Sequence, residues 1–368
     1  MRKREPTLFH PLANCHWRVF LRLYRRHWPY SFRSIPTQML TWAGVLAQIP
    51  GNALERRIYA DPIREHEFPE PPTFIVGHWR SGTTFLHNVL SRSGRFAFIN
   101  LAQTVRPLGA MRFAGAFEKL LGRIAPEERM ADSVQLAPKE PQEEELALAL
   151  MGSVSAFHSP FFPRDAERNS NRALFFDDLE PGELETFRAN YDLLARKVSL
   201  IDGGKRPLLF KNPSNTARLD FLRETFPGAR FIHIVRHPAD VARSSVRMAE
   251  ALTRHLSLQP LRETPVMERI LMNYARIIPL HLEQRERIEP GHYTEVRYED
   301  FREDPMKGVE DIYRNFGWEL DDDSRDSIRT YLDSIAGFRP NQRPKDPDLA
   351  AMIADRLAFA YDQWGYDP

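Results

Sequence analysis

Short apolar runs alternate with amphipathic segments along this 368-residue chain from about residue 71 onward. Four of these runs have the composition of strands, at residues 71–77, 206–211, 230–235 and 292–300. A segment with helical periodicity follows each run, at residues 83–94, 212–228, 236–252 and about 305–316. Short apolar strands that alternate with helices are typical of a parallel sheet covered on both faces. The pattern therefore predicts an α/β fold in which helices flank a parallel β-sheet.

Two long segments interrupt this alternation and show helical patterning with few strand signals. The first is residues 1–70, which we interpret as an N-terminal helical extension. The second is an insertion at about residues 95–205 within a main domain of residues 71–368. Ligands of open α/β sheets bind at the carboxyl ends of the strands. We therefore expect the insertion to form a wall or lid over that edge of the sheet.

The N-terminal segment contains a stretch, residues 17–32, in which aromatic residues alternate with arginines. Such a stretch suits either peripheral contact with a membrane or a helix docked on the protein core with its arginines in water. We favour the docked helix. No apolar run reaches the length of about 18–20 residues that a membrane span requires, and the N-terminus lacks the apolar region of a signal peptide. These features predict a cytoplasmic protein.

The amino-acid composition excludes some classes of ligand and favours others. The chain carries 51 Lys and Arg against 50 Asp and Glu, so its net charge of +1 argues against nucleic acid as a partner. Its single cysteine, Cys15, excludes an intramolecular disulfide and a cysteine-based zinc site. Only eight of the 51 cations are lysines and 43 are arginines. Arginine binds phosphate and carboxylate groups with a rigid fork of donors, which points to a small anionic ligand.

The turn after the first predicted strand has the outline of a phosphate-binding loop. It runs from Gly77 to Thr84 and reads GHWRSGTT. Glycines allow close approach of the backbone, and the N-terminus of the following helix attracts an anion. Thr83 stands where a nucleotide hydrolase has its lysine, and Arg80, inside the loop, supplies a cation instead.

The third strand and helix provide a second anion site. Arg236 follows the strand at 230–235, and Ser244 lies eight residues later on the predicted helix. An aspartate at such a strand end would hold magnesium, whereas an arginine suits a phosphate. We therefore expect these two residues to bind a phosphate, and we expect no metal.

These motifs together resemble one family. RSGTT (80–84), RHPADVARSS (236–245) and VRYEDFREDP (296–305) are similar to motifs of sulfotransferases that use 3′-phosphoadenosine 5′-phosphosulfate (PAPS). The segment PLLFKNPSNTARLDFLRETFPGARFIHIVRHP (207–238) resembles the bacterial branch related to the tyrosylprotein type. The resemblance covers roughly residues 70–305. It implies a P-loop-type fold and an enzyme that moves a sulfuryl group from PAPS to a hydroxyl or amine.

The resemblance also implies roles for individual residues. The 5′-phosphosulfate would lie among the loop residues, and Arg236 with Ser244 would hold the 3′-phosphate. Lys211 matches a lysine that contacts the phosphosulfate, and with Arg80 it is our candidate to stabilise the transfer. The YED motif at 298–300 is interpreted as structural. The implied loop contacts are Arg80, Ser81, Gly82, Thr83 and Thr84.

An acceptor hydroxyl also needs a base or an orienting group. The tyrosylprotein type places a glutamate about twenty residues after the loop arginine, but here the stretch FINLAQTVRP (98–107) has no carboxylate. Substitutes are the run Glu143–Glu145, of which Glu145 is our candidate, and His158. A charged first turn of a helix and a core histidine are the structural alternatives for these residues.

Two other functions fit part of the pattern. A P-loop kinase or NTPase is disfavoured by Thr83 and Arg236. A non-catalytic, membrane-associated nucleotide-binding protein has support only from the aromatic and arginine residues of the N-terminal segment. The acceptor is left open between a small molecule, a glycan, a lipid and a peptide.

Overall fold

The computed structural model describes residues 10–112, 115, 139–260, 266–337 and 347–367. The chain divides into two compact units, which we describe separately. The sheet unit comprises residues 70–97, 206–246 and 265–368, and the helical unit comprises residues 1–69, 98–205 and 247–264. Residues 113–114 and 116–138 of the predicted insertion lie outside the described residues.

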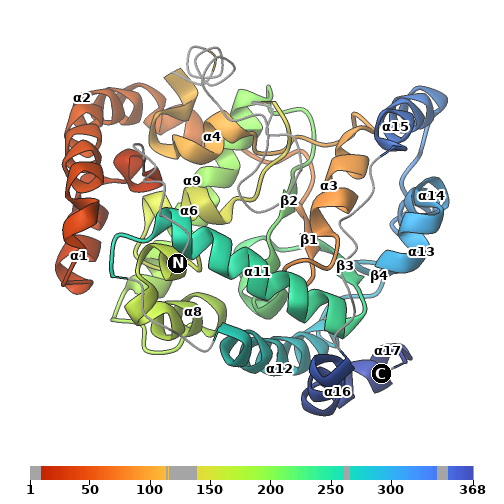
Figure 1. Cartoon of the computed structure of the whole chain (residues 1–368). Helices are drawn as coiled ribbons and strands as arrows, with labels where there is room; N and C mark the ends of the chain where they lie inside the picture. Colours follow the sequence, from red (N-terminus) through yellow and green to blue (C-terminus); the bar gives the residue numbers. More distant parts are fainter. Residues whose placement is uncertain (1–9, 113–114, 116–138, 261–265, 338–346, 368) are drawn as a thin grey trace. The chain divides into compact units, whose positions relative to one another are not determined.

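Four parallel strands form the sheet, in the order β2-β1-β3-β4 (Figure 1). This confirms the α/β fold with a parallel sheet flanked by helices. The strands are β1 (Thr73–Val76), β2 (Leu209–Lys211), β3 (Arg230–Val235) and β4 (Tyr293–Arg297). The helices of this unit are α3 (Thr83–Ser91), η5 (Pro213–Ala217), α10 (Leu219–Thr225), the first part of α11 (Pro238–Leu256), α12 (Val266–Arg285), α13 (Tyr298–Glu303), α14 (Pro305–Asn315), α15 (Asp322–Ile335), α16 (Pro347–Arg356) and α17 (Ala358–Trp364).

Successive side chains of the strands separate two apolar layers. On one face, Phe74 of β1 stacks between Phe210 of β2 and Phe231 of β3, with ring centroids 5.8 Å apart on each side. On the other face, Ile75 and Ile232 join the buried core that α3, α13, α14 and α15 complete. All four residues of β1 are buried, as expected of a central strand in a parallel sheet.

The end of β4 differs from the sequence-based expectation. The strand stops at Arg297, and residues 298–300, which we expected to finish it, form the first turn of α13. The predicted helix at about 305–316 corresponds to α14. An apolar tyrosine followed by acidic residues suits both a strand end and a helix start, because acidic side chains stabilise the first turn of a helix.

The helical unit is built around the buried side chains of its N-terminal segment and of residues 146–162. Phe20 and Leu23 of the first helix are buried, whereas the neighbouring Arg18, Arg22 and Arg25 are exposed. Residues 17–26 thus have the arrangement that we favoured, a helix docked on the core, whereas Trp28 and Phe32 of the same stretch are exposed. The helices of the unit are η1 (Pro11–Asn14), α1 (Trp17–Arg26), η2 (Phe32–Ser34), α2 (Ile35–Glu65), α4 (Leu101–Val105), η3 (Pro107–Gly109), α6 (Glu145–Met151), α7 (His158–Phe161), η4 (Pro163–Asp165), α8 (Ala166–Phe175), α9 (Glu183–Ile201) and the last part of α11.

Candidate functional site

The carboxyl ends of the four parallel strands meet at one edge of the sheet unit. Gly77 follows β1, Asn212 follows β2, Arg236 follows β3 and Tyr298 follows β4. Ile75 pairs with Lys211 on β2, so the last residue of β2 lies beside the end of β1. Every motif noted in the sequence except the candidate bases is attached to this edge.

The loop from Gly77 to Gly82 is held in a conformation that few residues tolerate. Gly82 precedes α3 with φ +104°, and an added Cβ would lie 2.3 Å from Cδ2 of Tyr298. Gly77 donates its backbone N–H to Oγ1 of Thr216 at 2.8 Å. Arg80 has φ +72°, a left-handed conformation that is rare for a residue with a side chain. Backbone conformations of this kind concentrate at ligand-binding sites.

Three predicted side chains meet above the loop. Nε of Arg80 donates to Oγ of Ser244 at 3.0 Å, and Nη1 of Arg236 donates to the backbone carbonyl of Arg80 at 3.3 Å. Arg236 also lies 3.4 Å from the carboxylate of Asp240, one helical turn into α11. The predicted phosphate pair, Arg236 and Ser244, is therefore joined through Arg80.

Lys211 reaches the same loop from the neighbouring strand. Its side chain is 1% exposed, and Nζ donates to Oγ1 of Thr84 at 3.4 Å. Thr84 is the second residue of α3, where backbone N–H groups lack partners within the helix. Lys211 thus places a cation beside the N-terminus of a helix, at a point where an anion would be stabilised by both.

Several buried polar atoms at this edge have no hydrogen-bond partner among the residues that the structure describes. They include Oγ of Ser81 and Nε2 of His78 in the loop, and Nε of Arg236 and Nδ1 of His237 after β3. A buried donor without a partner costs free energy, so such atoms in a native site indicate a ligand that completes them. The donor set around the loop consists of guanidinium, ammonium, hydroxyl and backbone N–H groups, which fits phosphate and sulfate oxygens.

Sequence reasoning missed the part played by Tyr298. The guanidinium of Arg236 lies over its ring, 4.5 Å from the centroid, and the same ring covers Gly82. The next residue, Glu299, accepts the backbone N–H of His237 at 3.2 Å and the hydroxyl of Tyr366 at 2.8 Å. The YED motif therefore supports both anion-binding elements, and its position in the family pattern was the one signal available for it.

The histidine inside the loop is part of the packing. His78 is 3% exposed, and its ring lies 4.7 Å from the ring of Tyr274 on α12. Burial disfavours the imidazolium and lowers the pKa of His78 to about 4. A neutral, buried ring gives this part of the loop a rigid support.

The two candidate bases belong to the helical unit. Oε1 of Glu145 accepts hydrogen bonds from Oγ of Ser155 at 2.8 Å and from the backbone N–H of Ala156 at 2.7 Å. His158 is 1% exposed, its Nε2 lies 3.1 Å from the carbonyl oxygen of Ala149, and burial lowers its pKa to about 4. Both side chains brace the turn between α6 and α7. Their role as bases stays a prediction.

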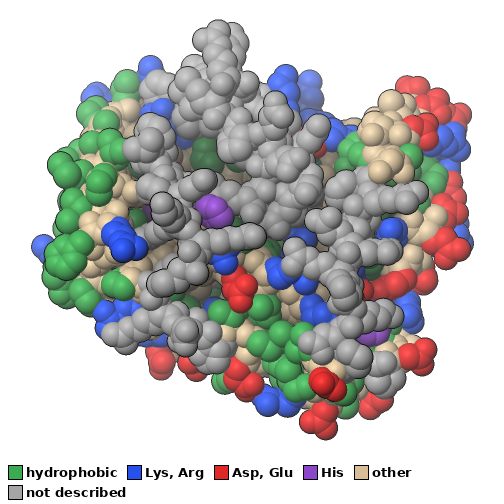
Figure 2. Space-filling view, viewed as in Figure 1, with side chains coloured by type: hydrophobic (Ala, Val, Ile, Leu, Met, Phe, Trp, Pro, Cys, Tyr) green, Lys and Arg blue, Asp and Glu red, His purple; other side chains and the backbone are tan. Residues whose placement is uncertain are grey.

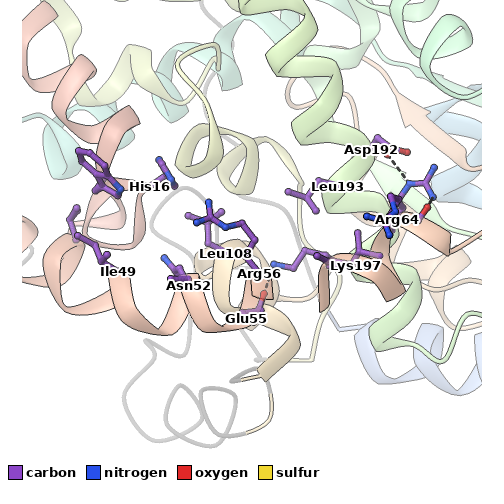
Figure 3. A pocket seen from close by; sticks show the side chains of 16 residues that line it. His16, Ile49, Asn52, Glu55, Arg56, Arg64, Leu108, Asp192, Leu193 and Lys197 are labelled. Carbon is purple, nitrogen blue, oxygen red and sulfur yellow. Dashed lines mark hydrogen bonds and ion pairs between the residues drawn. The ribbon is translucent and has the colours of Figure 1, made fainter. Parts of the chain in front are cut away.

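A cavity of about 390 Å³ lies in the helical unit, between α2, α9 and the start of α1 (Figure 3). Its wall is largely apolar, with Val45 and Ile49 from α2 and Leu193 from α9. Lys197 enters it and donates to Oε1 of Glu55 at 2.5 Å, and both side chains are almost fully buried. Burial lowers the pKa of Lys197, an effect that the Glu55 carboxylate opposes.

Among the described residues, no group of three or more His, Cys, Asp or Glu side chains is arranged to hold a metal ion. Three cations, Arg80, Lys211 and Arg236, belong to the loop or contact it, and the carboxylate of Asp240 in α11 pairs with Arg236. The chemistry of this edge is therefore that of anion binding.

Comparisons with known proteins agree with this geometry. A model of the sulfotransferase family matches residues 71–322. Omega-hydroxy-beta-dihydromenaquinone-9 sulfotransferase Stf3 of Mycobacterium bovis and of Mycobacterium tuberculosis is 28% identical over 316 residues, which are 85% of this chain and 80% of the relative.

Solved structures share the fold. Sulfotransferase STF9 of Mycobacterium avium has a TM-score of 0.72 at 16% identity and covers 94% of this chain and 89% of its own. Sulfotransferase STF1 of Mycobacterium tuberculosis has a TM-score of 0.64 at 18% identity, with 93% and 90% covered. The family match spans all four strands and their carboxyl ends, from β1 to the end of α14. The chain therefore belongs to the sulfotransferase family and is a PAPS-dependent sulfotransferase.

Proposed function

We propose that the edge formed by the ends of β1, β2 and β3 grips PAPS at two points. The loop residues Arg80 to Thr84 hold the 5′-phosphosulfate, and Arg236 with Ser244 holds the 3′-phosphate. The observation that carries the proposal is the chain of contacts from Arg236 through Arg80 to Ser244. The buried donor atoms of Ser81 and Arg236 that lack protein partners support it. Gly82, Thr83 and Thr84 contribute backbone N–H groups at the start of α3.

Sulfuryl transfer proceeds in line, and negative charge builds on the leaving phosphate oxygens. In our proposal Lys211 and Arg80 stabilise that charge, together with the N-terminus of α3, because positioned cations act without reorganisation. The role of Lys211 follows the resemblance to the tyrosylprotein type. Its burial and its contact with Thr84 support the assignment. No metal ion is needed for this stabilisation.

The acceptor, we propose, is a hydroxyl on a small molecule with a large apolar part. Two observations support this class over sugars and peptides. The Stf3 relatives are named for an omega-hydroxylated dihydromenaquinone. The helical unit holds an apolar-walled cavity of about 390 Å³, which is in the range of small-molecule sites. Glu145 and His158 stay the candidates for the group that orients or deprotonates the hydroxyl.

Transfer of labelled sulfate from PAPS to a panel of acceptors tests this function. The panel contains an omega-hydroxylated isoprenoid quinol, a phenol, a sugar and a tyrosyl peptide. We expect the isoprenoid alcohol to be the preferred acceptor. Preference for the sugar or the peptide would refute the acceptor class while leaving the donor assignment intact. Binding of adenosine 3′,5′-bisphosphate no tighter than binding of adenosine 5′-monophosphate would refute the assignment of Arg236 and Ser244.

A further inference from the structure

The longest helix of the helical unit, α2, buries polar side chains and exposes apolar ones. Between Ile35 and Leu54, four of the five buried residues of α2 are polar: Thr37, Gln38, Thr41 and Gln48. The large side chains exposed on the same stretch are apolar: Ile35 (46% exposed), Met39 (67%), Leu40 (41%), Leu46 (55%) and Leu54 (44%). A helix on the surface of a water-soluble protein normally has the opposite arrangement.

Specific contacts fix this orientation of α2. Gln38 accepts the hydroxyl of Tyr24 at 3.0 Å and donates to Oγ of Ser34 at 2.8 Å. Nε2 of Gln48 donates to the backbone carbonyl oxygen of Ala13 at 2.5 Å. Gly44 lies so close to η1 that an added Cβ would be 2.9 Å from Cβ of Ala13. Because Gln38 and Nε2 of Gln48 are hydrogen-bonded on the inner side of α2 and Gly44 is tightly packed there, the apolar side is held outward.

The apolar side continues beyond the start of the helix. Trp28 is 72% exposed and Phe32 is 88% exposed, and both lie just before α2. Ile58, at 48%, extends the surface toward the end of the helix. Figure 2 shows hydrophobic side chains along the left edge, where Figure 1 draws α2. We define the α2 outer face as Trp28, Phe32, Ile35, Met39, Leu40, Leu46, Leu54 and Ile58.

The charges around most of this face are positive, and within residues 28–65 exposed carboxylates occur only beyond its end, at Asp61 and Glu65. No Asp or Glu occurs between residues 6 and 54, which contain five arginines. Arg26 pairs with Glu180, and Arg22 lies 3.8 Å from Glu183, so these two are partly neutralised. Arg25, Arg33 and Arg57 are exposed. The face is thus an apolar surface with aromatic residues at one end and guanidinium groups at its margins.

We propose that the α2 outer face docks on the interface of an anionic lipid bilayer. Aromatic and aliphatic side chains that enter the boundary between headgroups and acyl chains, bordered by cations, are the features of interfacial membrane binding. No described helix of this chain is long and apolar enough to cross a bilayer, so the helix lies in the plane of the interface. The proposal stands on this surface and requires nothing of the acceptor.

A second copy of the chain is the other occupant to consider. In a two-fold symmetric dimer the same face meets itself, so Arg25, Arg33 and Arg57 of each copy would approach those of the other. Glu55, the one acidic residue within residues 28–58, is buried and pairs with Lys197, and Asp61, just beyond the face, pairs with Arg64. Anionic phospholipids supply that negative charge near the membrane surface. Charge complementarity therefore favours the bilayer.

Co-sedimentation of the full-length protein with vesicles tests the proposal. Vesicles of phosphatidylcholine alone are compared with vesicles that contain about 30% phosphatidylglycerol. We expect binding to the anionic vesicles that weakens as NaCl is raised. The double variant Met39→Glu/Leu46→Glu should bind about 10- to 100-fold more weakly, because two exposed apolar side chains no longer enter the lipid.

Met272→Glu is the matched control. Met272 is 50% exposed on α12, in the sheet unit, and its replacement should leave vesicle binding unchanged. Arg33→Gln/Arg57→Gln should weaken binding several-fold on anionic vesicles only. Thermal melting of each variant, expected to match the wild type because all five sites are exposed, excludes misfolding as the cause.

Three results would overturn the proposal. One is no binding to anionic vesicles at low salt. The second is equal loss of binding in Met272→Glu and in the α2 double variant. The third is a wild-type dimer that the α2 double variant converts to a monomer without any vesicle binding, which would assign the face to a second copy. Quenching of Trp28 fluorescence by brominated lipid, lost in Trp28→Phe while binding persists, would support it.

Discussion

Replacing Gly82 by alanine tests the geometry of the donor site most directly. Gly82 has φ +104°, and its added Cβ would lie 2.3 Å from Cδ2 and 2.8 Å from Cε2 of Tyr298. The left-handed backbone costs about 1–2 kcal/mol for an L-residue. The ring of Tyr298 must also move by about 1 Å or more to reach ordinary contact distance. That movement weakens its contact with Arg236, which is worth about 0.5–2 kcal/mol.

Together these effects predict that Gly82→Ala lowers the free energy of unfolding by about 1.5–4 kcal/mol. Affinity for adenosine 3′,5′-bisphosphate, measured by titration calorimetry, should fall about 10- to 100-fold. Gly94→Ala is the matched control, because Gly94 also has positive φ (+72°) but an added Cβ meets nothing within 4 Å. Gly94→Ala should lose about 1–2 kcal/mol of stability and keep its affinity for the nucleotide.

A double variant separates the contribution of the Tyr298 ring from that of the backbone. In a Tyr298→Ala background the ring is gone, so Gly82→Ala should cost only the backbone term, about 1–2 kcal/mol. An equal cost of Gly82→Ala in both backgrounds would show that the contact with Tyr298 contributes nothing. Unchanged nucleotide affinity in the single variant would refute the placement of the phosphosulfate at this loop.

Three further predictions concern individual residues. Arg236→Ala should weaken binding of adenosine 3′,5′-bisphosphate about 10- to 100-fold and leave binding of adenosine 5′-monophosphate unchanged, because a hydrogen bond to a charged group contributes about 1.5–3 kcal/mol. Lys211→Ala should lower kcat about 100- to 1,000-fold with little change in donor affinity, and equal effects on both would contradict a role in the transition state. Burial lowers the pKa of His158 to about 4, so this side chain is protonated at a higher pH in the unfolded chain than in the folded protein. Stability therefore falls as the pH drops from about 6.5 to 4. His158→Gln should flatten this loss, by up to roughly 3 kcal/mol at pH 4 in urea titrations, and lowered turnover with unchanged donor affinity would in addition identify His158 as the base.

The meeting of the candidate residues at one edge of the sheet was predictable because each of its parts is local in sequence. β2 and β3 are apolar runs of only a few residues. Lys211 is the last residue of β2, and Arg236 directly follows β3. A parallel sheet brings all such ends to one edge, whatever the order of its strands. The contact from Arg80 to Ser244 spans 164 residues of sequence but needs only that rule.

The support of that edge was not predictable in the same way. Tyr298 contacts Gly82 and Arg236 because β4 ends at Arg297 and the chain turns into α13 at Tyr298. The sequence continues the strand to Asp300, since valine, arginine and tyrosine are compatible with a strand. The hydrogen bonds of His158 and Glu145 are likewise set by a turn between α6 and α7 that has no periodic pattern. Contacts of this kind depend on tertiary structure, which a residue pattern does not report.

For α2, too, the sequence predicts the helix but not its contacts. Residues 35–54 carry no charge, so their sequence indicates a helix but not which side faces the core. The arginines of α1 suggested membrane contact for residues 17–32, of which Phe20 and Leu23 are buried while Trp28 and Phe32 belong to the α2 outer face. Polar contacts made by Gln38 and Gln48 determine the rotation of α2, and their partners come from other segments. In α2, polar contacts on the inner side hold an apolar surface outward, so both sides of the helix contribute to the exposure of that surface. This arrangement supports a docking function more strongly than exposed apolar residues alone would.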